Sequence, residues 1–244
     1  ITITGGITPT LTTSSSSTVL CSGSTGTLTA SGLSTYTWSP GSFTGSSFVI
    51  NPTASTIYTV VGTTTVGCTA TKTVNMAVNA NPTLSITSSS SSICFGGSTS
   101  LTAAGGTSYN WNTGSSATSI VVSPTTATIY TVTGTNALGC SNTQTISVSV
   151  NALPVINANS SSASICGGST ATLTATGGNS YSWNTGATTS VISVSPSTST
   201  TYTVTGTNAL GCTNTQTVSI SINATPTINA TSSSATICSG ATAT

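Results

Sequence analysis

The sequence contains no aspartate, no glutamate and no histidine, and its single basic residue is Lys72. An average soluble protein is about 25% charged. Without carboxylates the chain has no carboxylate general acid or base, no glycosidase pair and no oxygen cage for a hard cation. Without imidazole it has no Ser–His or Cys–His nucleophile pair and no histidine metal ligand. We therefore predict a protein that is not an enzyme and that uses no metal and no cofactor.

The lack of positive charge also limits the partners. One cation cannot form the basic surface that nucleic acid or anionic lipid requires. A Ser–Lys catalytic pair is conceivable, but Lys72 aligns with Gln144 and Gln216 at an outward strand position, so we expect it to face solvent. Apolar runs reach only three or four residues, against about 20 for a transmembrane helix. We predict neither nucleic-acid binding nor a membrane-spanning segment.

What the chain has instead is hydroxyl groups and cysteine. It holds 59 Thr and 47 Ser in 244 residues, and its apolar fraction is 35%, below the usual 45–50%. Its seven cysteines, in a chain without helical patterning, favour an oxidising compartment. We expect an extracellular or cell-surface protein.

A repeat of about 72 residues organises the whole sequence. Five kinds of residue recur in one register: Pro9, Pro82, Pro154 and Pro226; Cys21, Cys94, Cys166 and Cys238; Trp38, Trp111 and Trp183; Tyr58, Tyr130 and Tyr202; and Cys68, Cys140 and Cys212. These spacings predict whole repeats over 9–81, 82–153 and 154–225. Residues 1–8 match the last strand of a preceding repeat, and 226–244 match the opening of a further one. We expect the chain to be a window of a longer array.

Within a repeat the apolar residues alternate with polar ones, and glycine and asparagine mark the turns. In 154–225 the alternating pairs are Leu173 with Ala175, Tyr181 with Trp183, Ile192 with Val194 and Tyr202 with Val204, followed by Val218, Ile220 and Ile222. No segment offers helical spacing over ten residues. Six or seven short strands with a turn every 8–12 residues predict an all-β chain of tandem immunoglobulin-like β-sandwiches, arranged as a rod or filament.

The order of motifs supports this assignment. An early Cys is followed 17 residues later by Trp and then by a late Cys, and Ser195-Pro196 leading to Tyr202-Thr203-Val204 looks like a tyrosine corner. The string from Ile165-Cys166-Gly167-Gly168 to Asn208-Ala209-Leu210-Gly211-Cys212 resembles the Ig-like and PKD-like repeats of giant Bacteroidota surface proteins. These include gliding-motility-type adhesins exported by the type IX route. Relatives often carry Asp where Asn136 and Asn208 stand here, so the resemblance implies no Ca²⁺ site.

The cysteines allow two pairings. Bridges within repeats would be Cys21–Cys68, Cys94–Cys140 and Cys166–Cys212, with Cys238 pairing beyond the window. We favour this scheme, because small cores need such a covalent link. In a seven-strand sandwich, however, the two cysteines of a repeat lie at opposite ends, and bridges from one repeat to the next, Cys21–Cys140 and Cys94–Cys212, would then fit better. Zinc binding is disfavoured, since gaps of about 46 residues without a CxxC motif are poor zinc spacing.

The aromatic residues could either pack in the core or form a binding surface. A sandwich needs large buried aromatics, so we predict core positions for Trp38, Trp111, Trp183, Tyr58, Tyr130 and Tyr202. The alternative is a sugar-stacking platform formed by the Trp residues with Tyr36, Tyr109 and Tyr181. Asn159, Asn223 and Asn229 lie in N-x-S/T sequons, so glycans are conceivable partners.

The repeat, the missing catalytic groups and the missing charge together favour a structural function. Natural sheets usually guard their edges with charge, and this chain has almost none, so we expect self-association. The prediction is an extracellular filament built from tandem disulfide-linked Ig-like domains. The alternatives are a spacer stalk of a large cell-surface adhesin and a carbohydrate-binding module.

Overall fold

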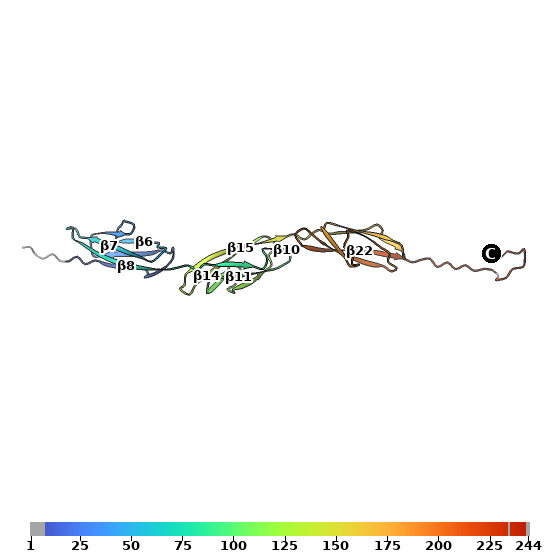
Figure 1. The fold of residues 1–244 in the computed structure, drawn as a ribbon, viewed down its shortest axis with the longest axis horizontal. Helices are drawn as coiled ribbons and strands as arrows, with labels where there is room; N and C mark the ends of the chain where they lie inside the picture. Colours follow the sequence, from blue (N-terminus) through green and yellow to red (C-terminus); the bar gives the residue numbers. More distant parts are fainter. Residues whose placement is uncertain (1–7, 234, 243–244) are drawn as a thin grey trace, which may run out of the picture. The chain divides into compact units, whose positions relative to one another are not determined.

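The computed structural model describes residues 8–233 and 235–242, and these residues form strands, turns and extended segments without any helix. The strands follow one another in three sets with nearly the same order (Figure 1). Alternating apolar residues and glycine turns dictate this arrangement, because each strand presents one apolar and one polar face. The predicted all-β class is confirmed.

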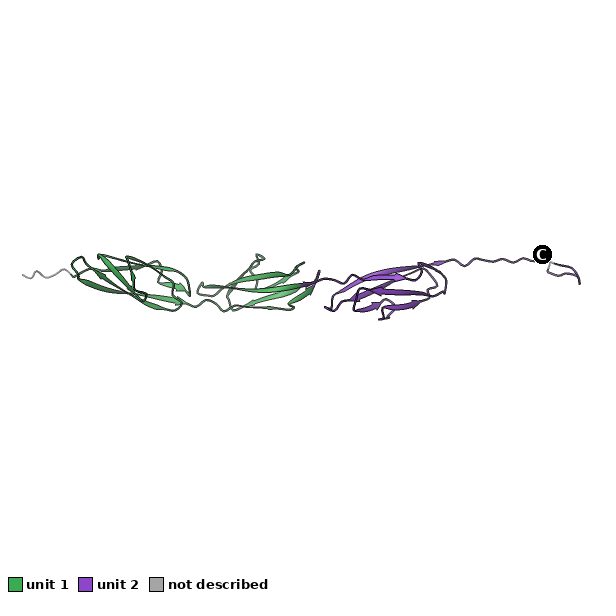
Figure 2. Ribbon diagram, turned by 90° about the horizontal axis from the view of Figure 1, so that it is seen from above, with its two compact units in different colours: residues 1–93, 97–149 green, residues 94–96, 150–244 purple. Residues whose placement is uncertain are grey.

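The chain divides into two compact units (Figure 2). Unit 1 takes the described residues up to Ile93 together with Gly97–Ser149, and unit 2 takes Cys94–Gly96 with the described residues from Val150 onward. Unit 1 therefore contains the first two sets of strands, except Cys94 at the end of β10 and residues 150–151 at the end of β15, and unit 2 contains the third set. These limits differ from the repeat limits, which stay a prediction from the spacings.

The first set in unit 1 has eight strands: β1 (Thr12–Ser15), β2 (Val19–Cys21), β3 (Gly26–Ser31), β4 (Thr35–Ser39), β5 (Phe43–Thr44), β6 (Ser47–Ile50), β7 (Thr56–Thr63) and β8 (Thr69–Asn79). They form a three-stranded sheet in the order β1-β3-β6 and a five-stranded sheet in the order β2-β8-β7-β4-β5.

The second set has seven strands: β9 (Ser85–Ser88), β10 (Ser92–Cys94), β11 (Thr99–Ala104), β12 (Ser108–Trp111), β13 (Ser119–Val122), β14 (Thr128–Thr135) and β15 (Ser141–Asn151). Its sheets have the orders β13-β11-β9 and β10-β15-β14-β12. The short β5 of the first set has no counterpart here.

The third set, in unit 2, also has seven strands: β16 (Asn157–Ser160), β17 (Ser164–Cys166), β18 (Ala171–Thr176), β19 (Ser180–Trp183), β20 (Val191–Val194), β21 (Thr200–Thr207) and β22 (Thr213–Asn223). Its sheets have the orders β16-β18-β20 and β17-β22-β21-β19.

The opening segment of a repeat contributes to both sheets. β1 pairs antiparallel with β3, and β2 then crosses to pair parallel with β8. β16 and β17 do the same with β18 and β22. Two facing sheets with this strand order are immunoglobulin-like β-sandwiches.

Each sandwich packs its apolar residues between its two sheets. Trp38, Trp111 and Trp183 are 0%, 2% and 3% exposed, and Tyr58, Tyr130 and Tyr202 are also buried. In unit 2 the core consists of Ile156, Ile165, Ala171, Leu173, Ala175, Trp183, Ile192, Tyr202, Val204 and Ile220. At about 25 cal/mol per Å² of buried apolar area, these side chains supply the main stabilisation of the sandwich.

The two ends of the chain carry no strand in the described residues. The strand predicted over 1–8 lies, except for Thr8, outside the described residues. The described residues after Asn223 are extended, apart from a turn in which the Ala241 N–H donates to the Cys238 carbonyl at 3.0 Å.

Candidate functional site at the linkers between repeats

Two disulfides connect the early cysteine of one repeat with the late cysteine of the next. Cys21 is bonded to Cys140 in unit 1, and Cys94 is bonded to Cys212 in unit 2. The Cα–Cα distance is 5.5 Å in both, and the bridges span 119 and 118 residues. Each bridge therefore runs parallel to the peptide linker that joins the same two repeats.

The favoured pairing within repeats is wrong, and the strand register gives the reason. Cys21 lies opposite Asn79, the last residue of β8, whereas Cys68 immediately precedes Thr69, the first. An 11-residue strand at about 3.4 Å per residue separates these positions by roughly 34 Å. Cα atoms joined by a disulfide lie only about 4.4–6.8 Å apart, so the two cysteines of one repeat cannot meet.

The late cysteine is held in a tight hairpin turn. The side-chain Oδ1 of Asn136 accepts the N–H groups of Leu138 and Cys140, both at 3.0 Å. The Asn136 N–H donates to the Cys140 carbonyl at 2.9 Å, and Gly139 supplies the left-handed conformation with a φ of 80°. The Cys140 side chain is fully buried, whereas its partner Cys21 is half-buried.

Two asparagine amides bind the linker beside this disulfide. Asn136 Nδ2 donates to the Ala80 carbonyl at 2.9 Å, and Asn142 Nδ2 donates to the Pro82 carbonyl at 3.1 Å. We call these two hydrogen bonds with the adjacent disulfide the linker clamp. Pro82 itself is buried.

Unit 2 repeats the linker clamp. Asn208 Nδ2 donates to the Ala152 carbonyl and Asn214 Nδ2 to the Pro154 carbonyl, each at 3.0 Å, next to the Cys94–Cys212 bridge. Sequence reasoning did not assign this role to the asparagines. Their recurrence at a spacing of 72 residues was the available signal.

Three predicted disulfide cysteines form no bridge among the described residues: Cys68, Cys166 and Cys238 are exposed free thiols. Cys68 lies in the hairpin of the first repeat, where Thr64 and Ala70 replace the two clamp asparagines. Thr64 still closes the turn, since its Oγ1 accepts the Cys68 N–H at 3.0 Å.

The Trp side chains pack in the core, and the Trp and Tyr side chains form hydrogen bonds with nearby loops. Trp38, Trp111 and Trp183 donate their indole N–H to the carbonyls of Gly45, Ala117 and Thr189 at 3.0, 2.9 and 3.0 Å. The Tyr109 hydroxyl accepts the Gly106 N–H at 3.0 Å and donates to its carbonyl at 2.9 Å, and Tyr36 and Tyr181 bind their own loops in the same way. The buried Trp faces cannot stack on a sugar.

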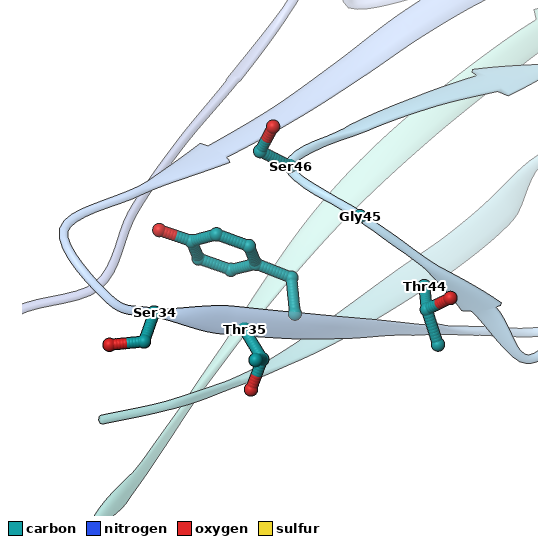
Figure 3. Close-up of a pocket in the computed structure, with 6 residues that line it drawn as sticks. Ser34, Thr35, Thr44, Gly45 and Ser46 are labelled. Carbon is teal, nitrogen blue, oxygen red and sulfur yellow. The ribbon is translucent and has the colours of Figure 1, made fainter. Parts of the chain in front are cut away.

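One shallow pocket of about 330 Å³ lies beside β5 in unit 1 (Figure 3). Ser34, Thr35, Tyr36, Thr44, Gly45 and Ser46 line it. Its walls carry neutral hydroxyls, and the Tyr36 hydroxyl is already bonded to Leu33. This lining offers no acid–base pair.

The other candidate groups lie apart from one another. Lys72 is exposed on β8, opposite Val60 of β7. The sequon residues Asn159, Asn223 and Asn229 are exposed. Among residues 8–233 and 235–242, no three metal-ligating side chains gather, and no helix is long and apolar enough to cross a membrane.

No family model and no curated protein sequence matches the chain. Solved structures with a similar strand arrangement include a 1.5-MDa bacterial ice-binding adhesin, at 15% identity and a TM-score of 0.29, covering 84% of this chain and 95% of that one. Titin domains I67–I69 (an E-to-A variant) match at 15% identity and a TM-score of 0.35, with coverages of 84% and 95%. The ICAM-5 D1–D4 fragment matches at 10% identity and a TM-score of 0.37, with coverages of 86% and 74%. The fold assignment therefore rests on the strand order itself.

Proposed function

We propose that this chain is a structural component of an extracellular filament, in which covalently coupled Ig-like domains carry mechanical load. The observation that carries this proposal is the linker clamp. In both clamps a disulfide and two asparagine amides reinforce the peptide linker that joins two repeats. A binding domain or an enzyme has no need of such reinforcement at each linker.

The overlap of the two bridges supports a load-bearing role. Cys94 lies inside the loop closed by Cys21–Cys140, and Cys140 lies inside the loop closed by Cys94–Cys212. The shortest covalent path from Cys21 to Cys212 crosses the first bridge, runs back from Cys140 to Cys94 and crosses the second. Within the Cys21–Cys212 section, a pulled chain would therefore keep β3–β8 and β16–β21 off the direct line of tension, whereas β1 and β2 before this section and β22 after it stay on that line.

The neutral surface supports association between copies. Outward hydroxyls pair across strands, as Thr12 with Ser31 at 2.6 Å and Thr201 with Ser219 at 2.8 Å. Edge strands β1 and β16 bear no charged residue. Since sheet edges without charge pair readily with other edges, lateral contacts between filaments follow from this composition.

The disulfides support an oxidising environment for the protein. The resemblance to repeats of giant Bacteroidota surface proteins supports an extracellular setting and export by the type IX route. A spacer stalk of an adhesin is the second candidate function, because the same linker clamps would stiffen a stalk.

Negative-stain electron microscopy of unreduced native material at low and high salt tests the proposal. We expect fibres longer than the contour of one chain and unchanged by salt, since the surface has almost no charge to screen. Isolated rods at all concentrations would favour the stalk instead. Compact particles without repeating domains would contradict both.

A further inference from the structure

We propose that the face around Cys166 in unit 2 is a docking site for the late-cysteine hairpin of another repeat of the same design, closed by a disulfide from Cys166. This inference rests on the proposed structural function and names the partner of one surface. It follows from comparing this face with the two places where the equivalent cysteine is already bonded.

Cys166 occupies the same position in its sandwich as Cys21. In the parallel pairing of β17 with β22 it lies opposite Asn223, as Cys21 lies opposite Asn79 in the pairing of β2 with β8. Cys21 is bonded to the late-cysteine hairpin of the following repeat. The same backbone geometry therefore presents the Cys166 thiol at the exit of β22.

The residues around Cys166 are exposed to solvent, whereas the equivalent residues around the bonded Cys21 and Cys94 are buried or half-buried. Pro82 and Pro154 are buried beside the linker clamps, whereas Pro226 is exposed. Asn79 and Asn151 are half-buried, whereas Asn223 is exposed. The Cys166 thiol, the end of β22 at Asn223 and Pro226 therefore correspond to the surface that a late-cysteine hairpin covers at Cys21 and at Cys94.

The partner hairpin has a defined chemistry: a four-residue turn closed by glycine, a late cysteine after it, and amides that reach linker carbonyls. Among the described residues, Cys68 is the late cysteine with a free and exposed thiol. Its turn is formed, with the Thr64 N–H donating to the Cys68 carbonyl at 2.9 Å. A second copy of this chain can therefore serve as the probe.

Closing the bridge oxidises two thiols and requires an oxidant, which we take to be a small-molecule disulfide. The thiolate of one cysteine attacks this disulfide, forming a mixed disulfide and releasing one small thiol. The docked second thiolate then attacks the mixed disulfide and releases the second small thiol. Two protein thiols and one disulfide thus become one protein disulfide and two small thiols.

The test uses two variants of the full chain that keep both existing bridges. The first, with Cys68→Ser and Cys238→Ser, leaves only Cys166 free. The second, with Cys166→Ser and Cys238→Ser, leaves only Cys68 free and restores the clamp with Thr64→Asn and Ala70→Asn. We mix them in glutathione disulfide and follow dimers by non-reducing electrophoresis, after peptide mapping has verified Cys21–Cys140 and Cys94–Cys212.

We expect the mixed dimer to form about tenfold faster than either homodimer, because docking raises the effective concentration of the two thiols. A matched control with Cys68→Ser and Cys166→Ser leaves only Cys238 free, and it should give no acceleration with the same partner. Rates for the mixed dimer within about twofold of the homodimers and of this control would overturn the proposal. Fibres seen by microscopy together with such equal rates would reject the docking face while leaving the filament proposal intact.

Discussion

Cys21 lies opposite Asn79 in the parallel pairing of β2 with β8, at the end of β8 from which the chain leaves the sandwich. The Ser22 N–H donates to the Asn79 carbonyl at 2.9 Å and extends this pairing by one residue. The bridge to Cys140 consequently starts beside the exit of the chain. The peptide linker and the disulfide therefore cross between the same two repeats side by side, and bending at the linker must also deform the bridge.

The bridging pattern predicts how far the chain extends under force. Unfolding the oxidised chain can stretch the Cys21–Cys212 section only along the 46 residues from Cys94 to Cys140, about 160 Å at roughly 3.5 Å per residue. After reduction the same section has 191 residues and should reach about 670 Å. Single-molecule force spectroscopy on the full chain measures both lengths.

Cys140→Ser and Cys68→Ser are the matched variants for that measurement. Without the first bridge the shortest path lengthens to the 73 residues from Cys21 to Cys94, about 260 Å. Cys68 forms no bridge, so Cys68→Ser should extend like the parent chain. A contour length for Cys68→Ser longer than that of the parent chain would show that Cys68 forms a bridge, as the pairing within repeats requires.

The linker clamp predicts a selective effect of Asn142→Ala. This change removes the hydrogen bond from Asn142 Nδ2 to the Pro82 carbonyl, worth about 1 kcal/mol. The equilibrium constant for Cys21–Cys140 formation in a glutathione redox buffer should fall about fivefold, while that of Cys94–Cys212 stays the same. Mass spectrometry of alkylated peptides across a redox series measures both bonds in one sample.

Asn214→Ala is the reciprocal control, since Asn214 binds the Pro154 carbonyl next to the other bridge. It should weaken Cys94–Cys212 and leave Cys21–Cys140 unchanged. Equal weakening of both bonds by either variant would show that the amides act on overall stability and not on their own linker.

Two glycines of unit 2 with similar backbone conformations predict unequal effects of alanine. Gly177 has a φ of 93°, and an added Cβ would collide with the Val155 carbonyl oxygen, whereas Gly186 has a φ of 87° and open space around it. Gly186→Ala should cost about 1–2 kcal/mol of unfolding free energy from conformation alone. Gly177→Ala should cost clearly more, because backbone must also move. Native-state hydrogen exchange in β21 measures both, and equal costs would contradict the collision.

The lack of titratable groups predicts a stability that hardly varies with pH in the acid and neutral range. Burial raises the pKa of Tyr58 above its ordinary value, so the fold favours the neutral phenol. Its contribution is therefore complete below the ordinary pKa and is lost as the pH rises through the raised one. Urea midpoints should be flat from about pH 4.5 to 7.5 and fall above about pH 10.

Tyr58→Phe is the control for the alkaline limb, and the free thiols are alkylated beforehand in both proteins. The alkaline decrease should shrink in this variant, while the flat region stays flat. A marked dependence on pH between 4.5 and 7.5, or on salt at neutral pH, would require ionic interactions that this sequence does not contain.

The sequence by itself determined the elements of the fold. Period-two alternation, such as Leu173 with Ala175, and the glycine turns act over a few neighbouring residues, so they can be interpreted without tertiary information. The confirmed all-β, Ig-like architecture follows from them, and the 72-residue spacing placed equivalent residues in register. The missing carboxylates and imidazoles likewise limit the chemistry that any fold of this chain could perform.

Only the tertiary structure decided which groups meet. Cys21 and Cys68 are closer in sequence than Cys21 and Cys140, yet the length of β8 holds the first pair at opposite ends of a sandwich. The acceptors of Asn136 and Asn142 are linker carbonyls more than 50 residues away along the chain. Local patterns specify strands and turns, but the pairing of distant side chains depends on which strand ends the folded chain brings together, and no local pattern encodes that distance.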